Sequence, residues 1–323
     1  MWIEGRGKEK NIMDRFLEFP IEILLKILSC LEIVELIKFS RTSKRIRIIC
    51  FDNSLWQNIN LSKKRVPTEF LQKVIAYGCK YINLNEAKIT GTLQLDNESQ
   101  LENLDLSGCT AENQSVFEEL LKSCHYLQKL TFTQKVKLEV MSQLTSQNGK
   151  TLQVLNCWQG IQCSSGWNPH LLELSTIECI IKNCNELKEL TFWSGMNRDK
   201  TNGNRWYYCG ICDDGIDYLV NNIPPEIEKF DFGNSAFGEE QINILVTRCT
   251  KLKELGLLIK TNVKNDILTH IIDTILKDDS ITHIVDHLKP TLEKLVIYDA
   301  GKVLIYKSHS ELSPLVQPTF TMR

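Results

Sequence analysis

The chain has 323 residues, of which 42% are hydrophobic, and it carries a formal net charge of −2. This near balance gives no general attraction to nucleic acid or to an anionic membrane surface. Residues 1–13 lack the apolar stretch of a signal peptide, and no run of about 18 apolar residues occurs. We therefore expect a soluble protein of the cytoplasm, the nucleus or both, without nucleic-acid or membrane partners.

Three short helices are predicted between Phe19 and Trp56. Pro20 fits a first helical turn because its φ is fixed and it lacks an N–H, and leucines then recur at helical spacing. A second helix begins near Glu32, and Ser and Thr residues at 40–43 separate it from a third. So few helical residues bury too little apolar surface to be stable alone. The segment therefore needs a partner chain, or it is a cap of the domain that follows.

The same segment carries an ordered set of short motifs. Phe-Pro, Leu-Leu, Ile-Leu, a Ser/Thr-Lys-Arg turn and Ser-Leu-Trp follow one another between Phe16 and about Leu61. This order resembles an F-box. Phe19, Ser43 and Ile46 depart from the residues common in that family and leave the hydrophobic pattern intact. The resemblance implies docking on a small Skp-type adaptor, and the predicted adaptor-binding residues are Pro20, Leu24, Leu28, Leu36, Leu55 and Trp56.

The unit L-x-x-L-x-L or a close variant then recurs eight times. Its copies start at Cys79, Leu101, Leu127, Leu152, Leu187, Ile227, Leu252 and Leu292. The alternation predicts a short strand whose leucines face inward. An amphipathic, helix-like run that ends in Cys precedes most copies. The predicted fold is therefore α/β: a three-helix F-box followed by a leucine-rich-repeat solenoid, a curved parallel sheet with outer helices.

The domain boundaries follow from these patterns. We expect a flexible N-terminus at 1–13, the F-box at 14–61, repeats at 62–300 and a C-terminal tail at 301–323. Three intervals between copies exceed the usual repeat length of about 20–29 residues. Two of them contain enlarged loops at 159–170 and 194–213, and the third holds helical patterns at 266–276 and 281–288.

The sequence contains twelve cysteines, several of them at repeat-defined positions. Cys79, Cys124, Cys184 and Cys249 follow the helical runs, which indicates reduced, buried thiols and not a disulfide framework. Cys209 and Cys212 form a CxxC pair in an enlarged loop. Zinc would need two more ligands, which Cys163 and His170 could supply, but a lone CxxC is a weak signal. We predict no metal and no cofactor, with a zinc-dependent or thiol-active protein as an alternative.

Aromatic residues gather where the enlarged loops begin. Trp158 and Trp193 occupy the position just after the inward-facing pair of two adjacent repeats. They either pack beneath their loops or form an exposed anchor, and Trp and Tyr dominate interface hot spots. Loops on a rigid scaffold often carry recognition. The predicted substrate-binding residues are Trp158, Trp193, Trp206, Tyr207 and Tyr208.

No nucleophile–base set, phosphate-binding loop or carboxylate pair at a catalytic spacing occurs in the sequence, so we predict a binding module and no catalytic residues. An F-box joined to leucine-rich repeats resembles the substrate-recognition subunits of SCF-type cullin–RING E3 ubiquitin ligases. That resemblance implies a cullin–RING partner reached through the adaptor, a protein substrate, and ubiquitination promoted by proximity. The alternative is a repeat scaffold or inhibitor without a ligase role.

Overall fold

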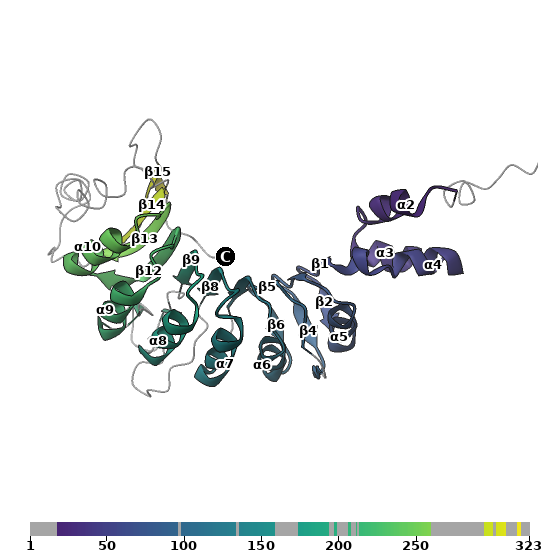
Figure 1. Cartoon of the computed structure of the whole chain (residues 1–323), viewed down its shortest axis with the longest axis horizontal. Coiled ribbons are helices and arrows are strands. Elements are labelled where there is room, and N and C mark those ends of the chain that lie inside the picture. The colour runs from purple at the N-terminus through teal and green to yellow at the C-terminus, as the bar shows by residue number, and fades with distance from the viewer. Residues whose placement is uncertain are drawn as a thin grey trace, which may run out of the picture.

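The computed structural model describes residues 18–95, 98–133, 136–158, 174–193, 197–198, 206–207, 211, 213–259, 294–299, 302–307 and 315–317. It is a mixed α/β structure in which a group of N-terminal helices adjoins a long, mostly parallel sheet (Figure 1). No helix within these ranges is long and apolar enough to cross a membrane.

The N-terminal group contains the three helices expected from the sequence, followed by a 3₁₀ turn. Its elements are α2 (Ile21–Leu28), α3 (Ile33–Phe39), α4 (Lys44–Cys50) and η1 (Asn53–Trp56). Ser43 caps α4, because its Oγ accepts a hydrogen bond from the N–H of Ile46 at 3.2 Å. Glu32 begins α3 in a capping box, with its N–H donating to Glu35 Oε2 at 3.2 Å.

The large sheet has eleven strands that follow the chain in order from one edge to the other. They are β1 (Asn58–Asn60), β3 (Tyr81–Asn83), β5 (Asn103–Leu106), β7 (Lys129–Phe132), β8 (Val154–Trp158), β9 (Glu189–Trp193), β12 (Lys229–Phe237), β13 (Glu254–Ile259), β14 (Lys294–Asp299), β15 (Lys302–Lys307) and β16 (Leu315–Gln317). Neighbours from β1 to β14 are parallel, and β15 and β16 are antiparallel.

Each of the eight recurring sequence units coincides with one strand, from β3 to β14. Three strands of the large sheet were not expected. β1 lies at the end of the segment taken for the F-box, and its Ile59 pairs directly with Ile82 of β3. β15 and β16 come from the segment taken for a tail, where the apolar run Val303–Tyr306 suits a strand.

The connecting helices lie on one side of the sheet, along the outer edge of the arc in Figure 1. They are α5 (Thr68–Ala76), α6 (Ser115–Lys122), α7 (Leu138–Asn148), α8 (Leu174–Asn183), α9 (Asp213–Asn222) and α10 (Glu239–Arg248). A small parallel sheet joins the first turns, with strands β2 (Arg65–Pro67), β4 (Lys88–Thr90) and β6 (Thr110–Ala111). Between β9 and α9 the chain forms an antiparallel pair, β10 (Asn197–Arg198) and β11 (Trp206–Tyr207).

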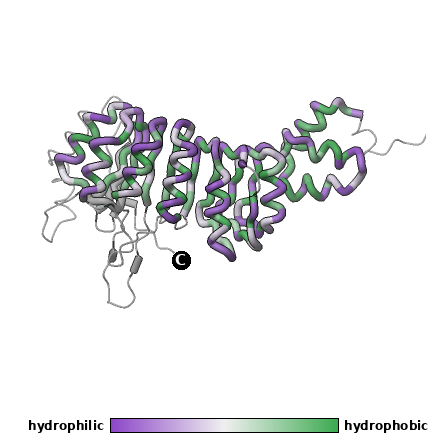
Figure 2. The backbone as a smooth tube through the Cα atoms, turned by 60° about the horizontal axis from the view of Figure 1, so that its bottom comes forward, coloured by the Kyte–Doolittle hydropathy of each residue, from purple (hydrophilic) through white to green (hydrophobic). Residues whose placement is uncertain are grey.

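The core lies between the strands and these helices. Apolar residues of successive parallel strands are direct register partners and are at most 1% exposed: Leu104, Leu130, Leu155, Leu190, Phe230 and Leu255. Along each turn of the chain in Figure 2, hydrophobic and hydrophilic stretches alternate, as elements with one buried face require. The leucines of the sequence unit therefore form one continuous apolar ladder through the sheet.

The cysteines that end the helical runs are buried and form no disulfides, as the sequence indicated. Cys79, Cys124, Cys184 and Cys249 are all 0% exposed, and each follows shortly after the end of a helix. Burial in apolar surroundings raises the pKa of Cys79, Cys184 and Cys249 to about 12, and that of Cys124 to about 11. These thiols therefore stay protonated at neutral pH.

Asn148 forms a buried polar joint between α7 and the segment that precedes β7. Its Oδ1 accepts a hydrogen bond from the N–H of Leu127 at 2.7 Å, and its Nδ2 donates to the carbonyl oxygens of Cys124 and Leu144 at 2.8 and 2.9 Å. The side chain is 0% exposed. It satisfies backbone groups that no water can reach, so α7 is fixed to the turn that enters β7.

We expect the buried thiols to react slowly with iodoacetamide at pH 8. A pKa raised from 9.0 to about 12 lowers the thiolate fraction of Cys79 by about a thousandfold, and burial adds a steric barrier. Among the cysteines that the structure describes, exposed Cys30 should react first. Mass spectrometry of timed samples measures this order, and loss of the difference in urea is the control. Early modification of Cys79 or Cys249 in the native protein would contradict the buried assignment.

Replacement of Asn148 by Leu should lower the free energy of unfolding by about 2–4 kcal/mol, because the Leu127 N–H and the Cys124 carbonyl lose their buried partner. Urea denaturation followed by circular dichroism measures this loss. Asn221→Leu is the matched control, since Asn221 lies near the end of α9 and its exposed amide donates only to Asp217 of its own helix. Equal destabilisation by both substitutions would count against the joint.

Candidate F-box-like helical surface

The N-terminal helices divide their apolar residues between two faces. Leu24, Leu28 and Leu36 are 2–3% exposed and pack into the core that the helices share with the first strands. Trp56 is also buried, whereas Leu55 is half-buried and Pro20 is exposed. Four of the six residues predicted to bind an adaptor are therefore buried in the core of their own chain, and Leu55 packs against that core. Whether any of the six also touches an adaptor stays a prediction.

A second set of apolar side chains points outward from the same helices. Among the described residues, eight large hydrophobic side chains are exposed, and six of them lie between residues 19 and 48: Phe19, Ile21, Ile23, Ile27, Val34 and Ile48. Ile23 and Ile27 are four residues apart and so lie on one face of α2. Such a concentration of exposed apolar residues is typical of a protein-binding surface.

The outward isoleucines were not expected from the sequence. The prediction assigned Leu24 and Leu28 to the adaptor-binding surface, and Ile23 and Ile27 follow the same spacing one residue earlier. That offset is the signal that could have identified them. A helix that is apolar on two faces needs a second apolar surface to cover the outer one.

Trp56 joins the helical group to the rest of the molecule. Its indole N–H donates to the carbonyl oxygen of Cys50 at 2.9 Å. The ring stacks on Phe51 with centroids 5.5 Å apart and packs against Tyr77, just after α5, at 5.3 Å. The residue predicted to lie at the adaptor surface therefore fixes α4 and η1 against the first helix behind the sheet.

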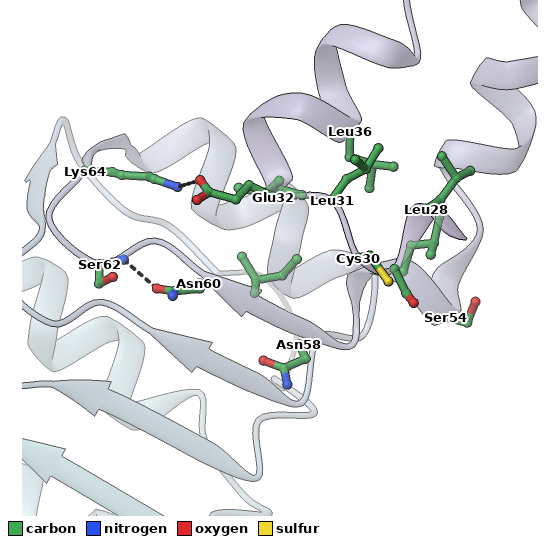
Figure 3. A pocket seen from close by; sticks show the side chains of 14 residues that line it. Leu28, Cys30, Leu31, Glu32, Leu36, Ser54, Asn58, Asn60, Ser62 and Lys64 are labelled. Carbon is green, nitrogen blue, oxygen red and sulfur yellow. Dashed lines mark hydrogen bonds and ion pairs between the residues drawn. The ribbon is translucent and has the colours of Figure 1, made fainter. Parts of the chain in front are cut away.

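A crevice of about 430 Å³ lies where the helices meet β1 (Figure 3). Leu28, Leu36 and Ile59 contribute apolar lining, and an ion pair crosses its polar end. In that pair Lys64 Nζ lies 2.9 Å from Glu32 Oε2, and the ammonium lowers the pKa of the Glu32 carboxyl. The ion pair ties the start of α3 to the loop after β1, so the crevice is part of the joint between the two parts of the chain.

Residues 16–62 match a family model described as F-box-like. The chain contains an F-box-like domain. The match begins just before α2 and ends just after β1, so it covers the helical group, the outward isoleucines and the Trp56 joint. F-box domains bind Skp-type adaptors, and this match therefore indicates an SCF-type adaptor-binding role for the N-terminal helices. F-box proteins are generally non-catalytic receptors.

The backbones of the two tryptophans predicted to bind substrate lie side by side on neighbouring strands. Trp158 ends β8, Trp193 ends β9, and the two are direct register partners. In the β10–β11 pair, Trp206 is opposite Arg198 and Tyr207 is opposite Asn197. Tyr208 lies outside the described residues. The backbone pairing agrees with the register expected from the sequence, and the role of these aromatics in substrate binding stays a prediction.

Several other expectations fall outside the described ranges. These are the N-terminus at 1–13, the loop at 159–170, the helical patterns at 266–276 and 281–288, and the possible zinc ligands Cys163, His170, Cys209 and Cys212. Most of the loop at 194–213 is outside as well. Within the described ranges, no group of three or more His, Cys, Asp or Glu side chains is placed to hold a metal ion.

Proposed function

We propose that this chain is the substrate-recognition subunit of an SCF-type cullin–RING ubiquitin ligase. The observation that carries the proposal is the F-box-like match at 16–62, over helices whose outer face exposes a cluster of isoleucines. The adaptor covers that face, and the cullin is reached through the adaptor. The remainder of the chain holds a protein substrate near the charged ubiquitin-conjugating enzyme, so catalysis is by proximity. The complex acts in the cytoplasm, the nucleus or both.

We further propose that the parallel sheet and its helices are a leucine-rich-repeat solenoid. The support is the coincidence of eight L-x-x-L-x-L units with eight consecutive strands, together with helices along one side of the sheet. We also propose that the segments 54–64 and 101–109 are similar to the S-phase kinase-associated F-box protein. The enlarged loops after Trp158 and Trp193 depart from its more even repeats, so its substrates and accessory subunit are not transferred.

On the substrate side, the proposed anchor is the aromatic group Trp158, Trp193, Trp206, Tyr207 and Tyr208. Its support is the direct pairing of Trp158 with Trp193 and the position of β11 between β9 and α9 in the chain. Neighbouring strands lie about 5 Å apart, so one ligand segment can touch both tryptophan positions. The competing function is a repeat scaffold without a ligase partner, and adaptor binding separates the two.

Ile23→Asp with Ile27→Asp should weaken adaptor binding by at least about a hundredfold, because two exposed apolar side chains would no longer be covered by the partner. Co-purification and titration with a Skp-type adaptor measure this loss. Tyr126→Asp is the control, since Tyr126 is also exposed and lies outside the F-box-like segment at 16–62. Unchanged affinity of the double variant would exclude this face. Changes at Leu24 or Leu28 are unsuitable, because both side chains are buried and we expect their replacement to destabilise the helices.

Trp158→Ala with Trp193→Ala should reduce substrate capture, since truncating a hot-spot aromatic typically costs about 2–4 kcal/mol of binding. Proximity labelling in cells, quantified against the wild type, measures capture. Adaptor binding and thermal stability should persist. Tyr81→Ala is the matched control, because Tyr81 is an exposed aromatic on β3 of the same sheet. Unfolding of the tryptophan variant would show that these residues serve packing.

A further inference from the structure

A stretch of positive charge runs from the end of α3 through most of α4. In a chain whose formal net charge is −2, residues 38–48 contain several cations and no acidic side chain. The cations are Lys38, Arg41, Lys44, Arg45 and Arg47, and all of them are exposed. None forms an ion pair within the part of the chain that the structure describes. We call these five side chains the basic patch.

Charges in the rest of the described chain are arranged differently. Several lysines there lie beside a carboxylate of a neighbouring element, with nitrogen–oxygen distances of 2.6–3.1 Å: Lys80 with Glu102, Lys137 with Glu118, Lys229 with Glu254, and Lys253 with Glu228. Such exposed pairs stabilise the fold little, but each cation has its counter-charge within the chain. The basic patch has none, so its charge is available to a partner.

The like charges of α4 also lie close to one another. Lys44 and Arg47 are three residues apart and therefore neighbours on the helix surface, where charges of the same sign repel. The first turn of α4 holds no acidic residue, whereas the first turns of α2, α3, α5, α6 and α7 each hold a glutamate. This concentration of charge is unfavourable for the helix alone, and a negatively charged partner surface would relieve the repulsion.

An apolar side chain stands among these cations. Ile48 is 76% exposed, the highest value among the exposed large hydrophobic residues that the structure describes. It follows Arg45 by three residues and Lys44 by four, so the three side chains share one side of α4. Protein interfaces combine an apolar centre with a polar rim. The basic patch around Ile48 has this composition, which favours a protein partner.

The neighbouring helices support the same class of partner. α2 and α3 pack beside α4 in one group (Figure 1), and they expose Glu22, Glu32 and Glu35. Nucleic acids and anionic membranes carry negative charge over a broad surface, so these carboxylates would weaken their binding. A protein with a local group of carboxylates avoids that repulsion. Because α4 lies inside the F-box-like match at 16–62, together with the outward isoleucines, the protein that fits is the adaptor.

We propose that the basic patch and Ile48 dock on an acidic surface of the Skp-type adaptor, beside the apolar contact made by the outward isoleucines. Opposite charges attract before the two surfaces meet, so the patch speeds association and orients the adaptor. The inference rests on the proposed adaptor binding. It adds the charge of the adaptor surface that faces α4, and it gives this helix a role in the rate of assembly.

The test measures association and dissociation rates of the full-length chain with a Skp-type adaptor by biolayer interferometry. Lys44→Gln, Arg45→Gln and Arg47→Gln are combined in one α4 variant, which keeps the buried Ile46 and Ile49. At an ionic strength of about 0.01 M, its association rate should be about tenfold or more below that of the wild type, with the dissociation rate changed less than about threefold. At about 0.5 M the two association rates should converge, because the Debye length is then only about 4 Å.

The matched control variant combines Arg65→Gln, Lys73→Gln and Lys88→Gln. These three cations are also exposed, and they lie outside residues 16–62. The control should keep the wild-type rates at every salt concentration. Thermal unfolding of the α4 variant should show an unchanged or raised midpoint, because repulsion between like charges is removed. A lowered midpoint would show that the cations serve the fold and would overturn the proposal.

The kinetic outcomes decide the remaining alternatives. The same salt dependence of association in the wild type and the α4 variant, an equal loss in the control variant, or a loss confined to the dissociation rate would each contradict the proposal. Unchanged adaptor kinetics with weaker binding of the α4 variant to anionic-lipid vesicles or duplex DNA would assign the patch to a polyanion instead. A wild type that binds no adaptor refutes the proposed function as well, whereas adaptor binding without salt-dependent association refutes this inference alone.

Discussion

The stacking of apolar strand residues on their register partners is the constraint on which the rest of the structure depends. Each of the central residues from Leu104 to Leu255 pairs directly with its counterparts on the neighbouring strands. A shift of one residue in any strand would turn its buried side chains to the opposite face. The register that fixes the core therefore also fixes which residues lie on the opposite face, and it makes Trp158 and Trp193 direct register partners.

The F-box-like helices are joined to this ladder through a common core. Trp56 packs against Phe51 and Tyr77, and β1 continues the sheet directly from the helical group. An ion pair at the surface, between Glu32 at the start of α3 and Lys64 after β1, also connects the helices to the sheet. This attachment matters for the proposed ligase role, because a receptor that acts by proximity has to hold its substrate at a defined distance from the adaptor.

The sheet face shows how a repeated position can change its use along one chain. In the early strands, the polar side chain between the two core residues accepts a hydrogen bond from the turn that follows, as at Asn83 and Asp105. β8 and β9 are longer, and Asn156 and Thr191 are left with buried, unpaired oxygens. The sheet is stabilised by the burial of the apolar residues from Leu104 to Leu255, which face away from these polar side chains.

The sequence alone determined the three N-terminal helices, the eight strands from β3 to β14 and the pairing of Trp158 with Trp193, because each follows from a short-range period with a constant offset to the leucines. It also indicated the buried cysteines. Only the tertiary structure decided which face of α2 is covered. Leucines and isoleucines are equally apolar, and the contacts of α3, α4 and the first strands, distant in sequence, place Leu24 inside and Ile23 outside. The unpaired oxygens of Asn156 and Thr191 depend likewise on how far two strands stay paired, which no local pattern records.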